Sequence, residues 1–133
     1  MIPMSFTHIK MSHNSFRGSV MNTIIVEDLI GSQIAVSMPL GDKLHEKIIE
    51  SFSSQEMVEL NFINIDTYAT PFFNASIGRL LKDYSIIELQ EKLKFTNISE
   101  GGRNLLNRVI ANAIEFYKNP DEIKKYVNEL GEV

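Results

Sequence analysis

Apolar and polar positions along the chain predict four strands separated by helical segments. β-branched residues at 23–26 favour a strand, and a short apolar run at 33–37 favours a second one. Apolar and polar residues alternate over residues 57–63, which is the period of a half-buried strand. A fourth strand is expected over residues 94–98. The first 20 residues show no clean period and are expected to form an arm or an edge strand.

Apolar residues spaced three or four positions apart predict helices over residues 39–52, 71–84, 85–93, 104–118 and 119–130. Thr70 is a good N-cap for the second helix, and Pro71 fits its first position, where no N–H is needed. Ser85 and Glu88 form the pattern of a capping box at the start of the third. The residues just before the fourth helix are expected to form a flexible loop because they include two glycines, Gly101 and Gly102.

The last predicted helix has its own start signals and a narrow apolar side. Asn119, Pro120 and Glu122 suit its N-cap, first and third positions. The same proline ends the preceding helix, because a residue before proline avoids the α region. The inner stripe of the last helix is formed by Ile123, Val127 and Leu130.

Composition restricts the range of functions. The 133 residues suit one domain, and a 44% hydrophobic content allows an ordinary core. No cysteine is present, which excludes disulfides and thiol nucleophiles. The net charge of −4 does not favour nucleic-acid binding. No apolar run reaches the roughly 20 residues of a membrane span, and the first 20 residues do not look like a signal peptide. We therefore expect a cytoplasmic protein without a membrane segment.

The segment from Leu60 to Leu80 carries the most specific motif in the chain. A hydrophobic strand leads through a turn into a helix that begins Ala-Thr-Pro-Phe-Phe-Asn and continues to the pair Ile77-Gly78. This arrangement resembles the strand–loop–helix signature of STAS domains, which include the anti-sigma factor antagonists. It resembles more closely the STAS-like family of unknown function, whose turn reads roughly Thr-Ser-x-Phe-Leu-Asn before an Ile-Gly pair. Residues 26–31 also resemble that family, and the likeness extends over residues 22–118.

The alternation of elements and this resemblance imply an α/β fold. We expect a mixed β-sheet of about four strands with helices packed against it. Residues 1–20 would precede a STAS-like domain that occupies residues 21–133 and includes the C-terminal helices. The resemblance further implies a bacterial, non-enzymatic regulatory module that binds a protein partner. In STAS domains that partner commonly carries a histidine-kinase-like ATPase domain, and phosphorylation at the helix start controls the contact.

The predicted binding surface is the loop 64–70 with the start of the following helix. Its candidate residues are Asp66, Thr67, Tyr68, Thr70, Phe72 and Asn74. Thr70 is the candidate phosphoacceptor, with a plain N-cap as the alternative; Thr67 and Ser76 are weaker substitutes. Phe73 continues the apolar stripe of the helix, so Phe72 is expected to be a contact residue or to pack against a neighbouring segment.

Three other interpretations remain open at this stage. A small nucleotide or anion could bind near the same helix start, or the chain could be a structural homo-oligomer such as a homodimer. Gly101, Gly102 and Arg103 could cradle a phosphate, although a flexible loop explains the glycines better. The three histidines form no HExxH motif, so no metal or other cofactor is expected, and His45 is expected to be a solvated side chain.

Overall fold

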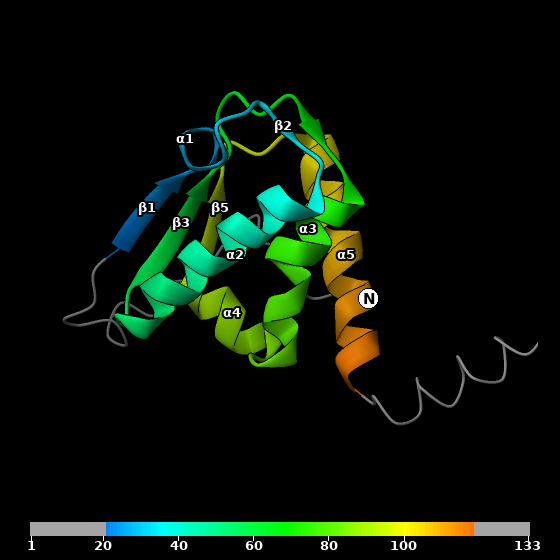
Figure 1. Ribbon diagram of the computed structural model, residues 1–133. Helices are drawn as coiled ribbons and strands as arrows, with labels where there is room; N and C mark the ends of the chain where they lie inside the picture. The colour runs from blue at the N-terminus through cyan, green and yellow to red at the C-terminus, as the bar shows by residue number, and fades with distance from the viewer. Residues whose placement is uncertain (1–20, 119–133) are drawn as a thin grey trace, which may run out of the picture.

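The computed structural model describes residues 21–118, in which strands and helices alternate as the sequence predicted (Figure 1). The elements are β1 (Met21–Ile25), α1 (Val26–Ile30), β2 (Ile34–Ala35), α2 (Met38–Ser53), β3 (Met57–Asn61), β4 (Thr67–Tyr68), α3 (Thr70–Ser76), the 3-10 helix η2 (Gly78–Lys82), α4 (Ile86–Lys92), β5 (Leu93–Thr96) and α5 (Glu100–Lys118). The predicted N-terminal arm at 1–20 and the predicted helix at 119–130 lie outside the described residues.

The α/β class is confirmed, but the sheet differs from the expected one in detail. β3 lies between β1 and β5 in a three-stranded sheet, while β2 and β4 form a separate pair. Every pairing among the described residues is parallel, rather than mixed, because a helical connection returns the chain between paired strands of the main sheet. The strand β4 falls in the segment predicted to be a loop. It is only two residues long, too short for alternation to reveal it.

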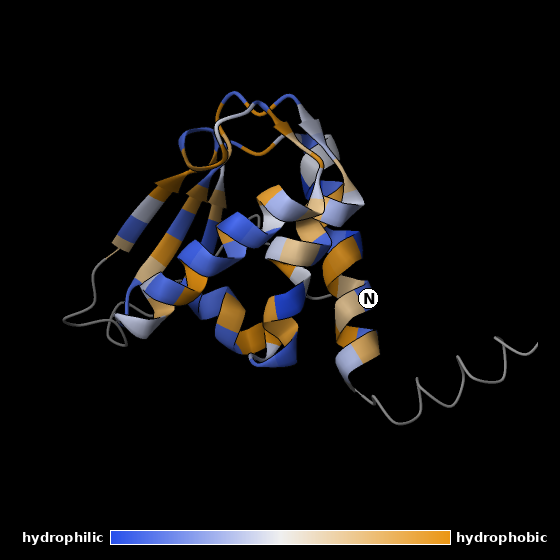
Figure 2. Ribbon diagram, in the orientation of Figure 1, coloured by the Kyte–Doolittle hydropathy of each residue, from blue (hydrophilic) through white to orange (hydrophobic). Residues whose placement is uncertain are grey.

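The two faces of the three-stranded sheet differ in chemistry. Helices α2 and α4 pack against the sheet (Figures 1 and 2). Val58 and Leu60 of β3 are fully buried, in one core cluster with Leu44 of α2 and Leu89 of α4. Glu59 points to the opposite face, where its carboxylate accepts hydrogen bonds from Thr23 at 3.1 Å and from Thr96 at 2.8 Å. The predicted alternation of β3 is therefore confirmed, and it directs the core toward the helices.

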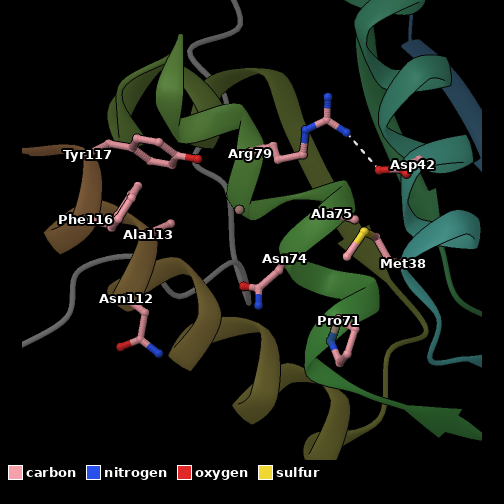
Figure 3. A pocket seen from close by; sticks show the side chains of 11 residues that line it. Met38, Asp42, Pro71, Asn74, Ala75, Arg79, Asn112, Ala113, Phe116 and Tyr117 are labelled. Atoms are coloured by element: carbon pink, nitrogen blue, oxygen red, sulfur yellow. Dashed lines mark hydrogen bonds and ion pairs between the residues drawn. The ribbon is translucent and has the colours of Figure 1, made fainter. Parts of the chain in front are cut away.

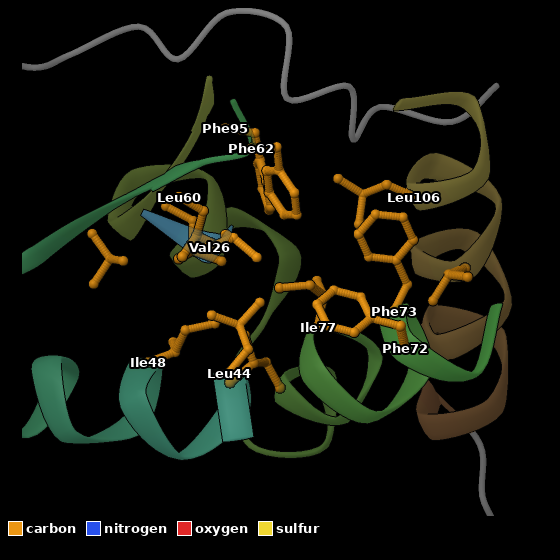
Figure 4. Packing of buried hydrophobic residues seen from close by; sticks show 14 of the residues in the cluster. Val26, Leu44, Ile48, Leu60, Phe62, Phe72, Phe73, Ile77, Phe95 and Leu106 are labelled. Carbon is orange, nitrogen blue, oxygen red and sulfur yellow. The ribbon is translucent and has the colours of Figure 1, made fainter. Parts of the chain in front are cut away.

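The short helix α3 lies between α2 and α5, and this position decides what it buries (Figure 1). Gly41 of α2 permits the close approach, because a Cβ atom there would lie 2.5 Å from the carbonyl oxygen of Phe72. Phe72 and Phe73 are both fully buried, with ring centroids 5.6 Å apart (Figure 4). Of the two expectations for Phe72, the exposed contact residue is wrong and packing against a neighbouring segment is confirmed, because neighbouring helices cover two sides of α3.

Helix boundaries also show where local signals were sufficient. The capping box at Ser85 and Glu88 is confirmed, with bonds of 2.8 and 3.1 Å. The helix predicted over residues 71–84 instead ends at Ser76 and continues as the 3-10 helix η2. Gly101 and Gly102 lie in the first turn of α5 and not in a loop. Ser99 accepts a hydrogen bond from the Gly102 amide at 3.0 Å, which caps this helix.

Candidate functional site: a groove between three helices

The predicted binding surface is exposed at four of its six candidate positions, Asp66, Thr67, Thr70 and Asn74. Asp66 precedes β4 and Thr67 lies in it, whereas Thr70 and Asn74 follow the turn that leads from β4 into α3. Thr70 is the first helical residue and not the N-cap, a position that Ala69 occupies in extended conformation. No side chain caps this helix; the Ala69 carbonyl accepts the Phe72 amide at 3.2 Å. The N-cap interpretation of Thr70 is therefore wrong by one residue, and its hydroxyl is not used to start the helix.

Tyr68 is a packing residue more than a surface contact. Its half-buried ring stacks on Phe73 at 5.7 Å and lies 5.9 Å from Phe62. Burial raises the pKa of Tyr68, and Ser99 offsets part of that rise without completing a well-formed hydrogen bond to its hydroxyl. A Cβ atom at Gly102 would lie 2.8 Å from the Tyr68 ring, so this glycine provides the space for the tyrosine.

The two weaker phosphoacceptor candidates, Ser76 and Thr67, differ in their exposure to solvent. Ser76 is fully buried, and its hydroxyl donates to the Phe72 carbonyl at 2.8 Å, so an enzyme cannot reach it. Thr67 is exposed on β4. Thr70 therefore keeps the position expected of a modifiable hydroxyl, while Ser76 is excluded.

A concave surface lies beside this turn, along the open side of α3. It is a groove of about 790 Å³ between the start of α2, the helices α3 and η2, and the end of α5 (Figure 3). We call it the groove; its lining consists of Met38, Asp42, Pro71, Asn74, Ala75, Gly78, Arg79, Asn112, Ala113, Phe116 and Tyr117. Asn74 is the one predicted binding residue that lines it, and Pro71 of the same motif lines it as well.

The chemistry of the groove is mainly apolar with a few polar groups. Met38 and Phe116 are 58% and 51% exposed, although large apolar side chains are usually buried. Arg79 and Asp42 form an ion pair of 2.9 Å at its edge, and Asn74 and Asn112 contribute amides (Figure 3). Among residues 21–118 no group of His, Cys, Asp or Glu side chains could hold a metal ion. Such a surface can bind an apolar group and orient it with a few hydrogen bonds.

His45 is not the solvated side chain that was expected. It is half-buried on α2, and its Nδ1 lies 3.1 Å from the Ser76 carbonyl oxygen. A carbonyl only accepts, so Nδ1 carries the proton. Burial lowers the pKa of His45 below its ordinary value of 6.5, and the bond to Ser76 partly opposes that change. Arg79 lowers this pKa further, whereas the nearby carboxylates of Asp42 and Asp83 raise it.

The glycine pair at the start of α5 does not form an open cradle. Gly102 is buried against Tyr68, and its amide already donates to Ser99. The guanidinium of Arg103 has one nitrogen, Nη1, that is buried without a hydrogen-bond partner among the described residues, and burial lowers the pKa of Arg103. The flexible-loop interpretation is wrong, and the Gly102 amide that a phosphate would need is occupied.

Sequence reasoning missed several residues that line the groove. Met38 and Phe116, which give it apolar character, and the polar Asn112 come from helices on either side of α3 and were not expected at a site. One signal was available: Phe116 and Tyr117 are consecutive aromatics, with ring centroids 4.9 Å apart, and only Tyr117 continues the helical spacing of Val109 and Ala113. An aromatic residue outside the apolar stripe of a helix indicates a second contact surface.

Residues 41–103 match a protein family described as a STAS-like domain of unknown function. The match begins in α2 and ends at the first turn of α5, so it contains the Thr-Pro turn and α3. It confirms the predicted resemblance over these residues. No curated protein and no solved structure matches the chain. In residues 21–118 there is no helix with the length and apolar character required to cross a membrane.

Proposed function

We propose that this chain is a non-enzymatic, STAS-like regulatory module that binds a protein partner in the groove. The observation that carries the proposal is the open apolar groove, in which Met38 and Phe116 are exposed at the cost of leaving apolar surface in water. Its polar groups are two amides, the hydroxyl of Tyr117 and an ion pair, a set with no nucleophile activated by a base. This lining supports binding better than catalysis.

The partner would place apolar side chains against Phe116 and the floor made by Pro71, Ala75 and Ala113. Aromatic residues dominate the energies of protein interfaces, so Phe116 is the expected centre of the contact. Met38 can adapt to the shape of the bound group, because its side chain is unbranched and flexible. Arg79 and Asp42 at the edge would set orientation more than affinity.

Thr70 is the proposed control point of this module. It is exposed, its hydroxyl caps no helix, and it precedes Pro71, which lines the groove. Phosphorylation there would add a charge of roughly −1.5 to −2 at one end of an apolar surface. An apolar or acidic partner would then bind more weakly. The class of partner implied by the family resemblance, a protein with a histidine-kinase-like ATPase domain, stays a prediction.

A second candidate is an apolar small molecule in place of a protein. Ligand pockets commonly have volumes of ~300–1,000 Å³, and the groove lies in that range at about 790 Å³. A nucleotide or anion fits less well, because the cation in the lining, Arg79, is already paired with Asp42. A thermal-shift screen with apolar ligands and with nucleotides would separate these alternatives.

The protein-binding proposal is tested with two matched variants, Met38→Asp and Ile87→Asp. Both side chains are exposed, at 58% and 65%, and both lie in the first turn of a helix, where an aspartate is tolerated. Met38 lines the groove and Ile87 does not. We expect affinity capture with the products of neighbouring genes to recover a partner with the wild type and with Ile87→Asp, but not with Met38→Asp. Equal recovery with all three would contradict the proposal.

A further inference from the structure

We propose that residues 119–133 of the same chain occupy the groove and compete with the partner for it. The inference rests on the proposed function of the groove and adds how access to it is regulated. The contact surface of the segment would be the apolar stripe of Ile123, Val127 and Leu130. A partner would bind only after displacing it.

The path of the chain supports this choice of occupant. The last two turns of α5 line the groove through Asn112, Ala113, Phe116 and Tyr117. Fifteen more residues follow Lys118, so they are tethered at the edge of the groove. A short tether gives a local concentration in the millimolar range, which allows even a weak contact to compete with a free partner.

The sequence of this segment supplies the means to reverse direction. Pro120 disfavours helical conformation at Asn119, so α5 is not expected to continue straight into the following residues. The sequence predicts Asn119 as the N-cap of a new helix that would begin at Pro120. A short break between two helices is the usual connection of an antiparallel pair. Such a pair would lay the second helix beside the end of α5, where the groove lies.

The energetics of a short helix require an apolar partner for its stripe. Residues 120–130 make about three turns, and isolated helices shorter than ~12–15 residues are marginal in water. Packing of the apolar side therefore decides whether this helix forms. The groove is an apolar surface lined by Phe116 and Tyr117, the two residues before Lys118, and its exposed Met38 and Phe116 gain by being covered.

The test uses the full chain. Because its sequence has no cysteine, one introduced cysteine can be labelled selectively. A Lys125→Cys substitution places one spin label on the side opposite the stripe. The methyl signals of Met38, in the groove, and Met21, outside it, are then compared by NMR. We expect the Met38 signal to lose most of its intensity and the Met21 signal to keep it.

Two further variants and a mixing control decide between outcomes. Val127→Asp should restore the Met38 signal, whereas Asn128→Asp, with the same charge change off the stripe, should not. Spin-labelled chains without isotope are also mixed with isotope-labelled chains without spin label. Loss of the Met38 signal in that mixture would assign the groove to a second copy and overturn the proposal, as would an unchanged Met38 signal in the single-chain sample.

This experiment can fail without affecting the proposed function, since no partner is present in it. If the segment occupies the groove, Val127→Asp should also bind the captured partner more tightly than the wild type does. Tighter binding would show that partner and segment share one site. An unchanged affinity beside a positive NMR result would leave the segment in the groove but contradict the competition.

Discussion

The two sides of α3 show how one seven-residue helix can serve both the core and a binding surface. On the buried side, Phe72, Phe73 and Ser76 have no exposed area, because α2 and the core close over them. On the open side, Pro71 and Asn74 are exposed and line the groove. Every residue in this contrast lies within six positions of the others. The neighbouring helices, more than the residue types, determine which side is available to a partner.

The comparison also explains why the groove lies where it does. Gly41 lets α2 approach α3 so closely that a Cβ atom at this position would collide with the Phe72 carbonyl oxygen and the Ala75 Cβ. On the open side, Met38 of α2 and Phe116 of α5 flank the helix without covering it (Figure 3). Close packing on one side thus leaves a concave surface on the other. The predictions below change one side at a time.

The largest effect is expected from Phe72→Ala on the buried side. Removal of a fully buried phenylalanine side chain leaves a cavity and should lower the free energy of unfolding by about 3–5 kcal/mol. Phe116→Ala on the open side should change it by no more than about 0.5 kcal/mol, because that ring is half exposed. Urea denaturation of the two variants measures the contrast. Similar losses in both would show that the two sides do not differ as described.

A smaller loss is expected from Gly41→Ala. The new methyl group would lie 2.5 Å from the Phe72 carbonyl oxygen and 2.9 Å from the Ala75 Cβ, so α2 and α3 must separate. Overpacking of this kind costs about 1–3 kcal/mol. The matched control is Gly101→Ala in α5, where nothing lies within 4 Å and alanine should stabilise the helix by about 0.5–1 kcal/mol. Thermal unfolding should move in opposite directions for the two variants.

His45, which contacts the Ser76 carbonyl of α3, makes the stability of the fold depend on pH. Its pKa in the folded state is below the ordinary value of 6.5, so between these two values the unfolded chain binds a proton that the folded chain does not. The contribution of neutral His45 to the stability of the fold is therefore complete above pH 6.5. It is lost as the pH falls toward the lowered pKa. Urea denaturation at pH 7.5 and 5.5 should show a smaller loss for His45→Gln than for the wild type. Identical losses would remove His45 from this role.

The smallest effect on stability is expected from Thr70→Ala. An N-cap substitution typically costs about 1 kcal/mol, and Ser85→Ala should lose that much because Ser85 caps α4. Thr70 makes no capping bond, so its loss should stay within about 0.5 kcal/mol. Denaturation curves of the two variants provide the check. A loss at Thr70 equal to that at Ser85 would restore its structural role.

Local signals in the sequence were enough for the parts of the fold that depend on one element. The alternation around Val58 and Leu60 identified β3 and its buried face, and the capping box identified the start of α4. The position of Phe72 could not be predicted in this way. A helical period shows which residues share a face, but not how many neighbours cover the helix. The space required by Tyr68 at Gly102 depends likewise on segments more than 30 residues apart.

The site was predicted only where it coincides with the recognised motif. Asn74 was a candidate and lies in the groove, and Thr70 is exposed beside it. Met38 and Phe116 come from helices far from that motif in sequence. Their side chains line one groove only after three helices pack together, so no spacing in the sequence predicts it. The turn and the groove consequently remain two distinct surfaces, and a binding experiment can separate them.

The most direct test of the groove is the dissociation constant of the captured partner for Phe116→Ala and Ile34→Ala. The two side chains are equally exposed, at 51% and 50%, but Phe116 lines the groove and Ile34 lies on β2, beside Thr67 of the predicted loop surface. A central aromatic contact is worth about 2 kcal/mol or more, so Phe116→Ala should raise the dissociation constant roughly 30-fold. Ile34→Ala should leave it unchanged. A large loss with Ile34→Ala and none with Phe116→Ala would contradict the account and return the binding site to the turn.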